Sequence, residues 1–247
     1  MAFLNKYSLI ILSVFLLQSC SKDKSGACLT REGDIIIIER VLEGNFKILE
    51  IYDDAIVTIK QGLESKAIVR GGEKLIDSYI TRVDGDRLII ENNTKCKWTR
   101  DLSTPFEVTI IMPEIEKIYN YGYGGIKSDG DLQVQDLYIE TVDGLGFIDL
   151  DVYGNNLDLI QHTGAVNVTL RGSFDYVFTY SSSHSIIDMS QLAVRDGYYQ
   201  NVGTGDFRIN TTDILKVQLD FTGDIYYTND PEIEIKSQIG SGILIHY

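Results

Sequence analysis

Residues 144–153, GLGFIDLDVY, and residues 203–210, GTGDFRIN, share one pattern, in which a glycine turn is followed by alternating apolar and polar residues. Equivalent turns recur every 18–22 residues, at Gly124, Gly146, Gly164, Ser185, Gly205, Gly223 and Gly242. The position two places after each turn is always apolar: Ile126, Ile148, Val166, Ile187, Phe207, Ile225 and Leu244. Alternation with a period of two is typical of a strand with one buried face. Each turn is therefore expected to open a strand.

A second short strand precedes most of these turns, at residues 137–139, 157–159, 177–180, 215–219 and 233–235. A repeat of about 20 residues with two or three strands predicts a β-solenoid, whose repeats bury their apolar faces by stacking. A β-sandwich is the alternative, but it gives no reason for seven turns in register. The solenoid is expected to stack one internal ladder from Ile148, Val166, Ile187, Phe207 and Ile225.

The first half of the chain is also rich in strands but less regular. Strand-like runs occur at residues 35–38, 46–51, 55–60, 67–69, 88–91 and 106–111. The whole chain has 22 Gly, 15 Tyr and 9 Phe but only 3 Pro, which is a composition of strands and turns. We therefore predict an all-β protein, with a β-rich N-terminal part at residues 33–113 and solenoid repeats at residues 114–247.

The N-terminus has the features of an export signal. Lys6 precedes an apolar run, residues 8–17, that is too short to span a bilayer. Residues 17–20, LQSC, then resemble the lipobox of bacterial lipoproteins, in which the cysteine receives a lipid. We predict a signal peptide at residues 1–19, a lipidated Cys20, and a tether at residues 20–32. The two other cysteines, Cys28 and Cys96, could form a disulfide in an oxidising compartment.

Charge and motif content limit the classes of function. The chain has 22 basic and 36 acidic residues, a net charge of −14, which disfavours nucleic-acid binding. Asp149 and Asp151 share the outward face of one strand, and Asp188 falls on the same ladder. Such carboxylates could act as acid and base on a polysaccharide or bind a cation, but a solvated outer face is the favoured interpretation. The histidines, His162, His184 and His246, lie in different repeats, so no metal site, catalytic residue or cofactor is predicted.

Aromatic residues offer a candidate binding surface. Tyr119, Tyr121 and Tyr123 alternate on one face, and Tyr198, Tyr199 and Trp98 are further members. Tyrosine combines a large contact area with a polar tip, which suits a glycan or protein ligand. Ordinary solenoid packing with hydroxyls at the rim is the competing interpretation, and it carries more weight.

In sequence order, several segments resemble the adhesin family of the head GIN domain, found in Bacteroidetes-type lipoproteins. These are residues 46–48, 56–62, 71–76, 84–90 and 108–113, and the Gly-x-Gly turns at 122–124, 203–205 and 240–242. The resemblance implies a right-handed parallel β-helix and supplies no catalytic residues. It implies an exported domain with adhesion as a label given by analogy. Together with the lipobox, this predicts a lipoprotein anchored by its lipid in the bacterial cell envelope, at the outer membrane, that binds or scaffolds there. A β-helical lyase or glycosidase acting on polysaccharides is the alternative.

Overall fold

The structure, a computed structural model, describes residues 32–95 and 106–247, which form eighteen strands and one turn of 3₁₀ helix, η2 (Ile76–Ser78). In chain order the strands are β1 (Ile35–Val41), β2 (Ile48–Ile51), β3 (Ile56–Gln61), β4 (Lys66–Gly72), β5 (Tyr79–Asp84), β6 (Arg87–Asn92), β7 (Glu107–Met112), β8 (Lys117–Asn120), β9 (Gly125–Ser128), β10 (Leu132–Gln133), β11 (Asp136–Thr141), β12 (Gly144–Gln161), β13 (Gly164–Ser181), β14 (Ile187–Asn201), β15 (Phe207–Leu219), β16 (Ile225–Thr228), β17 (Glu232–Ser237) and β18 (Leu244–His246). Within these described ranges, no helix is long and apolar enough to cross a membrane. The predicted all-β class is confirmed.

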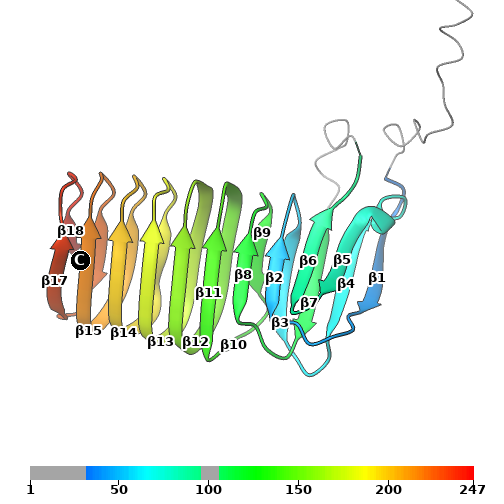
Figure 1. The fold of residues 1–247 in the computed structure, drawn as a ribbon, viewed down its shortest axis with the longest axis horizontal. Helices are drawn as coiled ribbons and strands as arrows, with labels where there is room; N and C mark the ends of the chain where they lie inside the picture. Colours follow the sequence, from blue (N-terminus) through cyan, green and yellow to red (C-terminus); the bar gives the residue numbers. More distant parts are fainter. Residues whose placement is uncertain (1–31, 96–105) are drawn as a thin grey trace, which may run out of the picture. The chain divides into compact units, whose positions relative to one another are not determined.

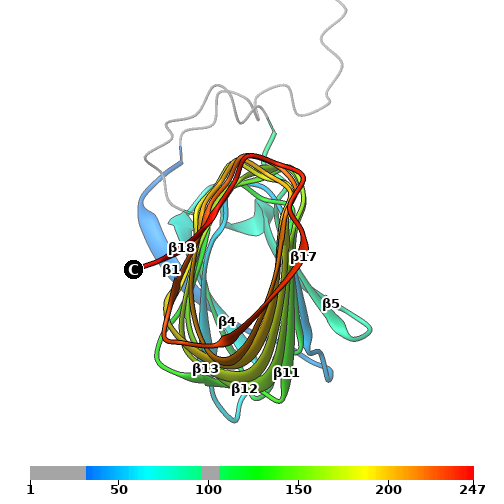
Figure 2. The same ribbon diagram turned by 90° about the vertical axis from the view of Figure 1, so that its left-hand side faces the viewer.

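All eighteen strands are connected by pairing and stack as two faces, called sheet 1 and sheet 2 (Figure 1). Sheet 1 has the order β1-β4-β7-β3-β9-β12-β13-β14-β15-β16-β18, and sheet 2 has the order β5-β6-β2-β8-β11-β12-β13-β14-β15-β17. The short β10 pairs with the middle of β12, at Val152 and Tyr153. The long strands β12 to β15 turn a corner, so each contributes to both sheets. Figure 2 looks along the stack, where successive passages of the chain, called rungs below, overlay one another. The pairing between these rungs is parallel, which confirms the predicted β-solenoid.

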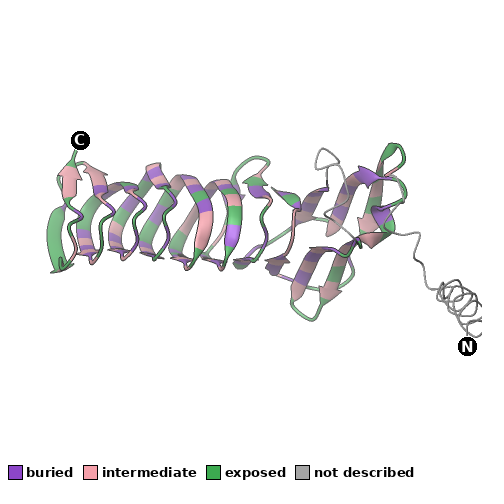
Figure 3. Cartoon of the chain, turned by 90° about the horizontal axis from the view of Figure 1, so that it is seen from above, coloured by how far each residue is buried: buried purple, intermediate pink, exposed green. Residues whose placement is uncertain are grey.

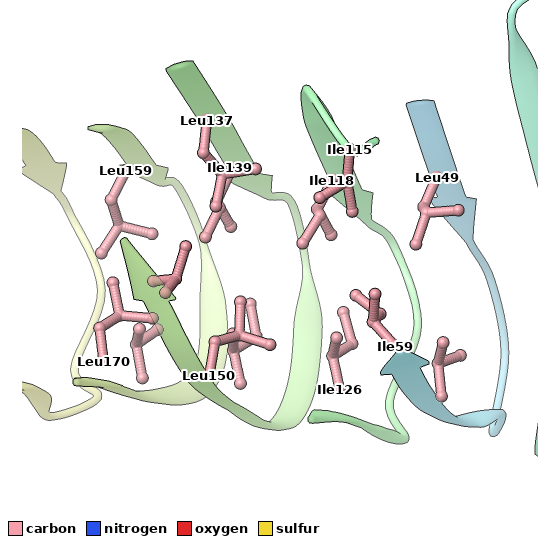
Figure 4. Packing of buried hydrophobic residues seen from close by; sticks show 14 of the residues in the cluster. Leu49, Ile59, Ile115, Ile118, Ile126, Leu137, Ile139, Leu150, Leu159 and Leu170 are labelled. Atoms are coloured by element: carbon pink, nitrogen blue, oxygen red, sulfur yellow. The ribbon is translucent and has the colours of Figure 1, made fainter. Parts of the chain in front are cut away.

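Buried residues alternate with more exposed ones along most strands, so the core lies between the two sheets (Figure 3). Figure 4 shows Leu49, Ile118 and Ile139 of sheet 2 across the core from Ile126 and Leu150 of sheet 1. Neighbouring rungs lie about 4.8 Å apart, so each apolar side chain packs on its equivalents above and below. Full burial of one such side chain contributes about 1.5–3 kcal/mol. Each rung therefore depends on its neighbours above and below for the burial of its apolar side chains.

The predicted internal ladder is present with one correction. Strand pairing aligns Ile126, Ile148, Val168, Ile187, Phe207, Ile225 and Leu244. The prediction that Val166 belongs to this ladder is wrong, because Val166 lies opposite Gly146. Val166 is nevertheless buried, since residues two apart point to the same side of a strand. Shifting the alignment of two rungs by two residues therefore still matches buried positions with buried positions.

The parallel rungs do not follow one another in sequence order, because β2 and β3 lie inside the stack. β2 and β3 lie between the rung of β6 and β7 and the rung of β8 and β9, with parallel pairing on both sides. β1, β4 and β5 pair antiparallel and lie beyond the β6 and β7 rung. This order places residues after β2 beside residues after β8, although about 70 positions separate them in the sequence.

Buried polar side chains stabilise the turns that follow sheet 2. The side-chain oxygens of Asn120 and Asn201 each accept a hydrogen bond from the N–H two residues further on, at 3.1 and 3.2 Å. In the turn where serine replaces glycine, Ser181 Oγ accepts the N–H of Ser183, and the Ser183 and Ser185 hydroxyls bond each other at 2.5 Å. Because these groups are buried, such bonds replace those lost to water. The serine turn thus keeps its place in the stack, although β14 pairs irregularly with both neighbours.

Candidate functional site

Aromatic side chains from successive rungs gather on the outward side of sheet 2, called the tyrosine face below. Its members are Tyr52, Tyr119, Tyr121, Tyr138, Tyr176, Phe178, Tyr180 and Tyr198. All are partly exposed and alternate with buried residues of the core. One ladder crosses consecutive rungs in the order Lys117, Tyr138, Asp158, Phe178, Tyr198 and Lys216. The face is therefore built by strand register.

The rings form two groups along the stack. In the first, Tyr52 and Tyr121 stack with ring centroids 5.1 Å apart, and Tyr119 contacts Tyr121 and Tyr138 at 6.4 and 5.8 Å. The second group includes Phe178 and Tyr198, 5.6 Å apart. Aromatic pairs at such separations contribute about 0.5–1.5 kcal/mol beyond their burial. The contacts hold the rings in fixed positions on the surface.

Polar groups lie between the rings. Tyr138 Oη donates to Glu140 at 2.9 Å, and Glu140 also contacts His162 Nε2 at 3.1 Å. Further along, Gln200 Nε2 donates to Tyr198 Oη at 2.6 Å. Two cations flank the first group, with the Arg87 guanidinium 5.7 Å from the Tyr119 ring centroid and Lys117 Nζ 6.0 Å from that of Tyr138. Rings and hydrogen-bonding groups thus alternate over the same surface.

The phenols of Tyr52, Tyr121, Tyr138 and Tyr176 stay protonated at neutral pH. Burial, followed by the hydrogen bond to Glu140, raises the pKa of Tyr138 well above its ordinary value. Burial is also the main cause that raises the pKa values of Tyr52, Tyr121 and Tyr176, with nearby carboxylates adding to it. Each hydroxyl can therefore act as a hydrogen-bond donor.

A hollow of about 530 Å³ adjoins the face at the edge where β8 and β11 begin. It is lined by Lys47, Glu114, Ile115, Glu116, Lys117, Gln133, Val134, Gln135, Asp136, Leu137, Tyr138, Asn156 and Asp158. Asn156 Nδ2 donates to Asp136 at 2.5 Å, and Lys47 is paired with Glu114 and Glu116 at 2.6 and 2.8 Å. Burial, followed by repulsion from Asp136, raises the pKa of Asp158.

The outward side of sheet 1 has a different character. Arg171 bridges the two candidate catalytic carboxylates, Asp149 and Asp151, at 2.5 and 2.6 Å. Asp188 lies on the ladder of Asp149, as predicted, with Thr169 between them, and pairs with Arg208 at 3.6 Å. Exposed pairs of this kind typically contribute about 0–1 kcal/mol each. They form an ion-paired outer surface between rungs.

Comparison with known proteins identifies the family. Residues 45–231 match the model of the family described as "Putative auto-transporter adhesin, head GIN domain". The chain belongs to this family. No curated protein is significantly similar to it.

Solved structures share the fold of this head GIN family member at low sequence identity. A "putative adhesin" from Bacteroides fragilis NCTC 9343 is 18% identical with a TM-score of 0.79, covering 87% of this chain and 97% of that one. A "putative adhesin" from Parabacteroides merdae ATCC 43184 is 16% identical with a TM-score of 0.66, covering 88% and 98%. A "putative lipid binding protein" from Parabacteroides distasonis ATCC 8503 is 16% identical with a TM-score of 0.64, covering 87% and 97%.

The structure brings together some of the predicted surface residues and separates others. Tyr119, Tyr121 and Tyr198 lie on the tyrosine face. Tyr123 is exposed but lies past the end of β8, where its N–H donates to the Asp53 carbonyl. Tyr199 is a wrong prediction: it points into the core, fully buried, and its hydroxyl contacts Thr211 Oγ1 at 3.0 Å. Trp98, Cys20, Cys28 and Cys96 lie outside the described residues.

Members of the tyrosine face that sequence reasoning missed include Tyr52, Tyr138 and Phe178. Tyr138, Phe178 and Tyr198 recur at intervals of 40 and 20 residues, which are multiples of the repeat length. Extending the ladder analysis from the inward to the outward positions would have found them. Tyr52 carries no such signal, because its rung is inserted out of sequence order.

Proposed function

We propose that this head GIN family member is an exported, lipid-anchored lipoprotein whose tyrosine face binds a glycan or protein ligand at the bacterial cell envelope. One observation carries the proposal: aromatic side chains from the rungs of β2, β8, β11, β13 and β14 converge on one outward face, interrupted only at β12 by Asp158, while sheet 1 carries ion pairs. Large aromatic side chains that stay partly exposed on a stable scaffold are typical of binding surfaces. Membership of an adhesin-type family supports a role in binding rather than catalysis.

The location forms part of the same proposal. The lipobox at residues 17–20 supports attachment through Cys20, and the adhesin-type family supports the cell envelope, with the outer membrane as the proposed site. The net charge of −14 supports a ligand other than nucleic acid. Residues 20–32 would then serve as the tether between the lipid and β1.

Replacing Cys20 by alanine is expected to move the protein from the membrane to the soluble fraction. The thiol of Cys20 is the group that would carry the lipid, so the variant loses its anchor. Partitioning into a detergent phase measures this, with Cys28→Ala as the matched control that keeps the lipobox cysteine. Equal detergent partitioning of Cys20→Ala and wild type would contradict lipid anchoring.

Combined substitution of Tyr119, Phe178 and Tyr198 by alanine is expected to weaken attachment to bacterial envelopes by at least about tenfold, because aromatic residues dominate binding energies. Tyr226→Ala is the matched control, since Tyr226 is a partly exposed tyrosine on the outward side of sheet 1. Binding of the purified protein to isolated envelopes, and to arrays of glycans and proteins, provides the measurement. Unchanged attachment of the triple variant would exclude the tyrosine face as the binding surface.

A further inference from the structure

We propose that the hollow beside Tyr138 receives one pyranose unit of an uncharged glycan, and that the following units lie across the strands along the tyrosine face. This inference rests on the proposed function and names the ligand class of its binding surface. Three observations carry it: the chemistry of the hollow, the charge of its surroundings, and the direction of the aromatic ladder.

The hollow offers the groups that recognise sugar hydroxyls. Gln133, Gln135 and Asn156 supply amides, and Asp136 and Asp158 supply carboxylates, around the ring of Tyr138. A volume of about 530 Å³ lies within the range of small-molecule sites. Among the described residues, no hydrogen bond or ion pair reaches the side chain of Asp158, although partial burial penalises its charged form. Because Asp158 is exposed and its side-chain oxygens have no partner among the described residues, its carboxylate is available to accept hydrogen bonds from a ligand.

Charge selects against anionic glycans. The hollow contains four carboxylates, those of Glu114, Glu116, Asp136 and Asp158, against two lysines, and Lys47 is already paired with Glu114 and Glu116. Glu140 extends the acidic character along the same face, where Glu50 and Asp196 are paired with Arg87 and Arg195. A uronate or sulfate placed here would meet like charge in partly desolvated surroundings, which weakens binding. An uncharged sugar meets no such repulsion.

The mixture of rings and carboxylates favours a glycan over a protein partner. Charged residues are depleted from the centres of protein interfaces, where they would be desolvated. On the tyrosine face they occupy the centre, since Asp158 stands between Tyr138 and Phe178 in the ladder. A hydroxyl-rich ligand can satisfy these carboxylates while its apolar ring faces lie on the aromatic rings.

The ladder also fixes the direction of the bound chain. Tyr138, Phe178 and Tyr198 occupy the same register position in rungs about 4.8 Å apart, so they span about 14 Å perpendicular to the strands. One pyranose unit and its glycosidic bond are about as long as one rung spacing. A short oligosaccharide that starts in the hollow would therefore reach Tyr198.

The test uses the full chain and hexasaccharide probes. Uncharged hexamers of glucose, mannose, galactose and N-acetylglucosamine are compared with a hexamer that alternates N-acetylglucosamine and glucuronic acid. We expect calorimetry to detect binding of at least one uncharged hexamer, insensitive to salt, and no binding of the anionic hexamer. Chemical shift changes should cluster at residues 133–138 and 156–158. Asp158→Ala and Tyr138→Ala should each weaken binding by at least about tenfold.

Asp188→Ala, an acidic substitution on the outward side of sheet 1, is the matched control and should bind like wild type. Asp158→Ala is expected to fold normally, because Asp158 is exposed and its side chain makes no hydrogen bond or ion pair within the described residues. Binding of the anionic hexamer alone, or equal binding by Asp158→Ala and wild type, would overturn the inference. If no hexamer binds while a salt-sensitive basic peptide does, and the tyrosine-face triple variant loses attachment, the proposed function stands and the glycan inference fails.

Discussion

Replacing Phe207 by alanine is expected to lower the free energy of unfolding by about 3–5 kcal/mol. Phe207 opens β15 and is fully buried, with Ile187 in the preceding rung and Ile225 in the following one at the same register position. Truncation leaves a cavity bordered by rungs on both sides, and backbone hydrogen bonds between those rungs oppose its collapse. Chemical denaturation of the variant and the wild type gives the difference.

Asp188→Ala is the control for Phe207→Ala, because Asp188 belongs to the neighbouring rung but points outward. Burial raises the pKa of Asp188, but the hydrogen bonds from Ser190 and the charge of Arg208 outweigh it and lower the pKa. Loss of these surface interactions is expected to cost about 1 kcal/mol or less. A larger loss for Asp188→Ala than for Phe207→Ala would reverse the assignment of inward and outward faces.

Replacing Gly146 by alanine is expected to cost about 2–5 kcal/mol of stability, from backbone strain together with overpacking. Gly146 has φ +91°, which side chains rarely adopt, and an added Cβ would lie 1.8 Å from the carbonyl oxygen of Gly124 in the neighbouring rung. That oxygen belongs to the backbone of the stack, so it cannot move without disturbing the rung. Thermal or chemical denaturation measures the effect.

Gly130→Ala separates the two causes. Gly130 has a similar φ, +87°, but an added Cβ would meet no atom within 4 Å. Its substitution is therefore expected to cost only the backbone strain, about 1–2 kcal/mol. The difference between the two variants measures how closely the rungs approach at Gly146. Equal losses of stability in the two variants would show that the close approach of the rungs at Gly146 adds nothing to the cost.

The sequence alone was enough to predict the solenoid, because a parallel stack requires each rung to repeat the same inward positions. Ile148, Ile187, Phe207 and Ile225 were placed correctly for this reason. The error at Val166 has a physical cause: rungs differ in length, and a slip of two residues preserves the inward and outward alternation. Periodicity therefore predicts which side a residue faces more securely than which residue it stacks on.

The candidate site depended more on tertiary structure. Of the adjacent pair Tyr198 and Tyr199, strand geometry requires one to point inward, and the register selects Tyr199, whose ring occupies the space left open by Gly197. The contact between Tyr52 and Tyr121 arises only because the rung of β2 and β3 is inserted before that of β8 and β9. Composition and period determined that this chain is an all-β stack rich in aromatic residues. Only the order of the rungs, a long-range property of strand pairing, decided which of those residues share one face.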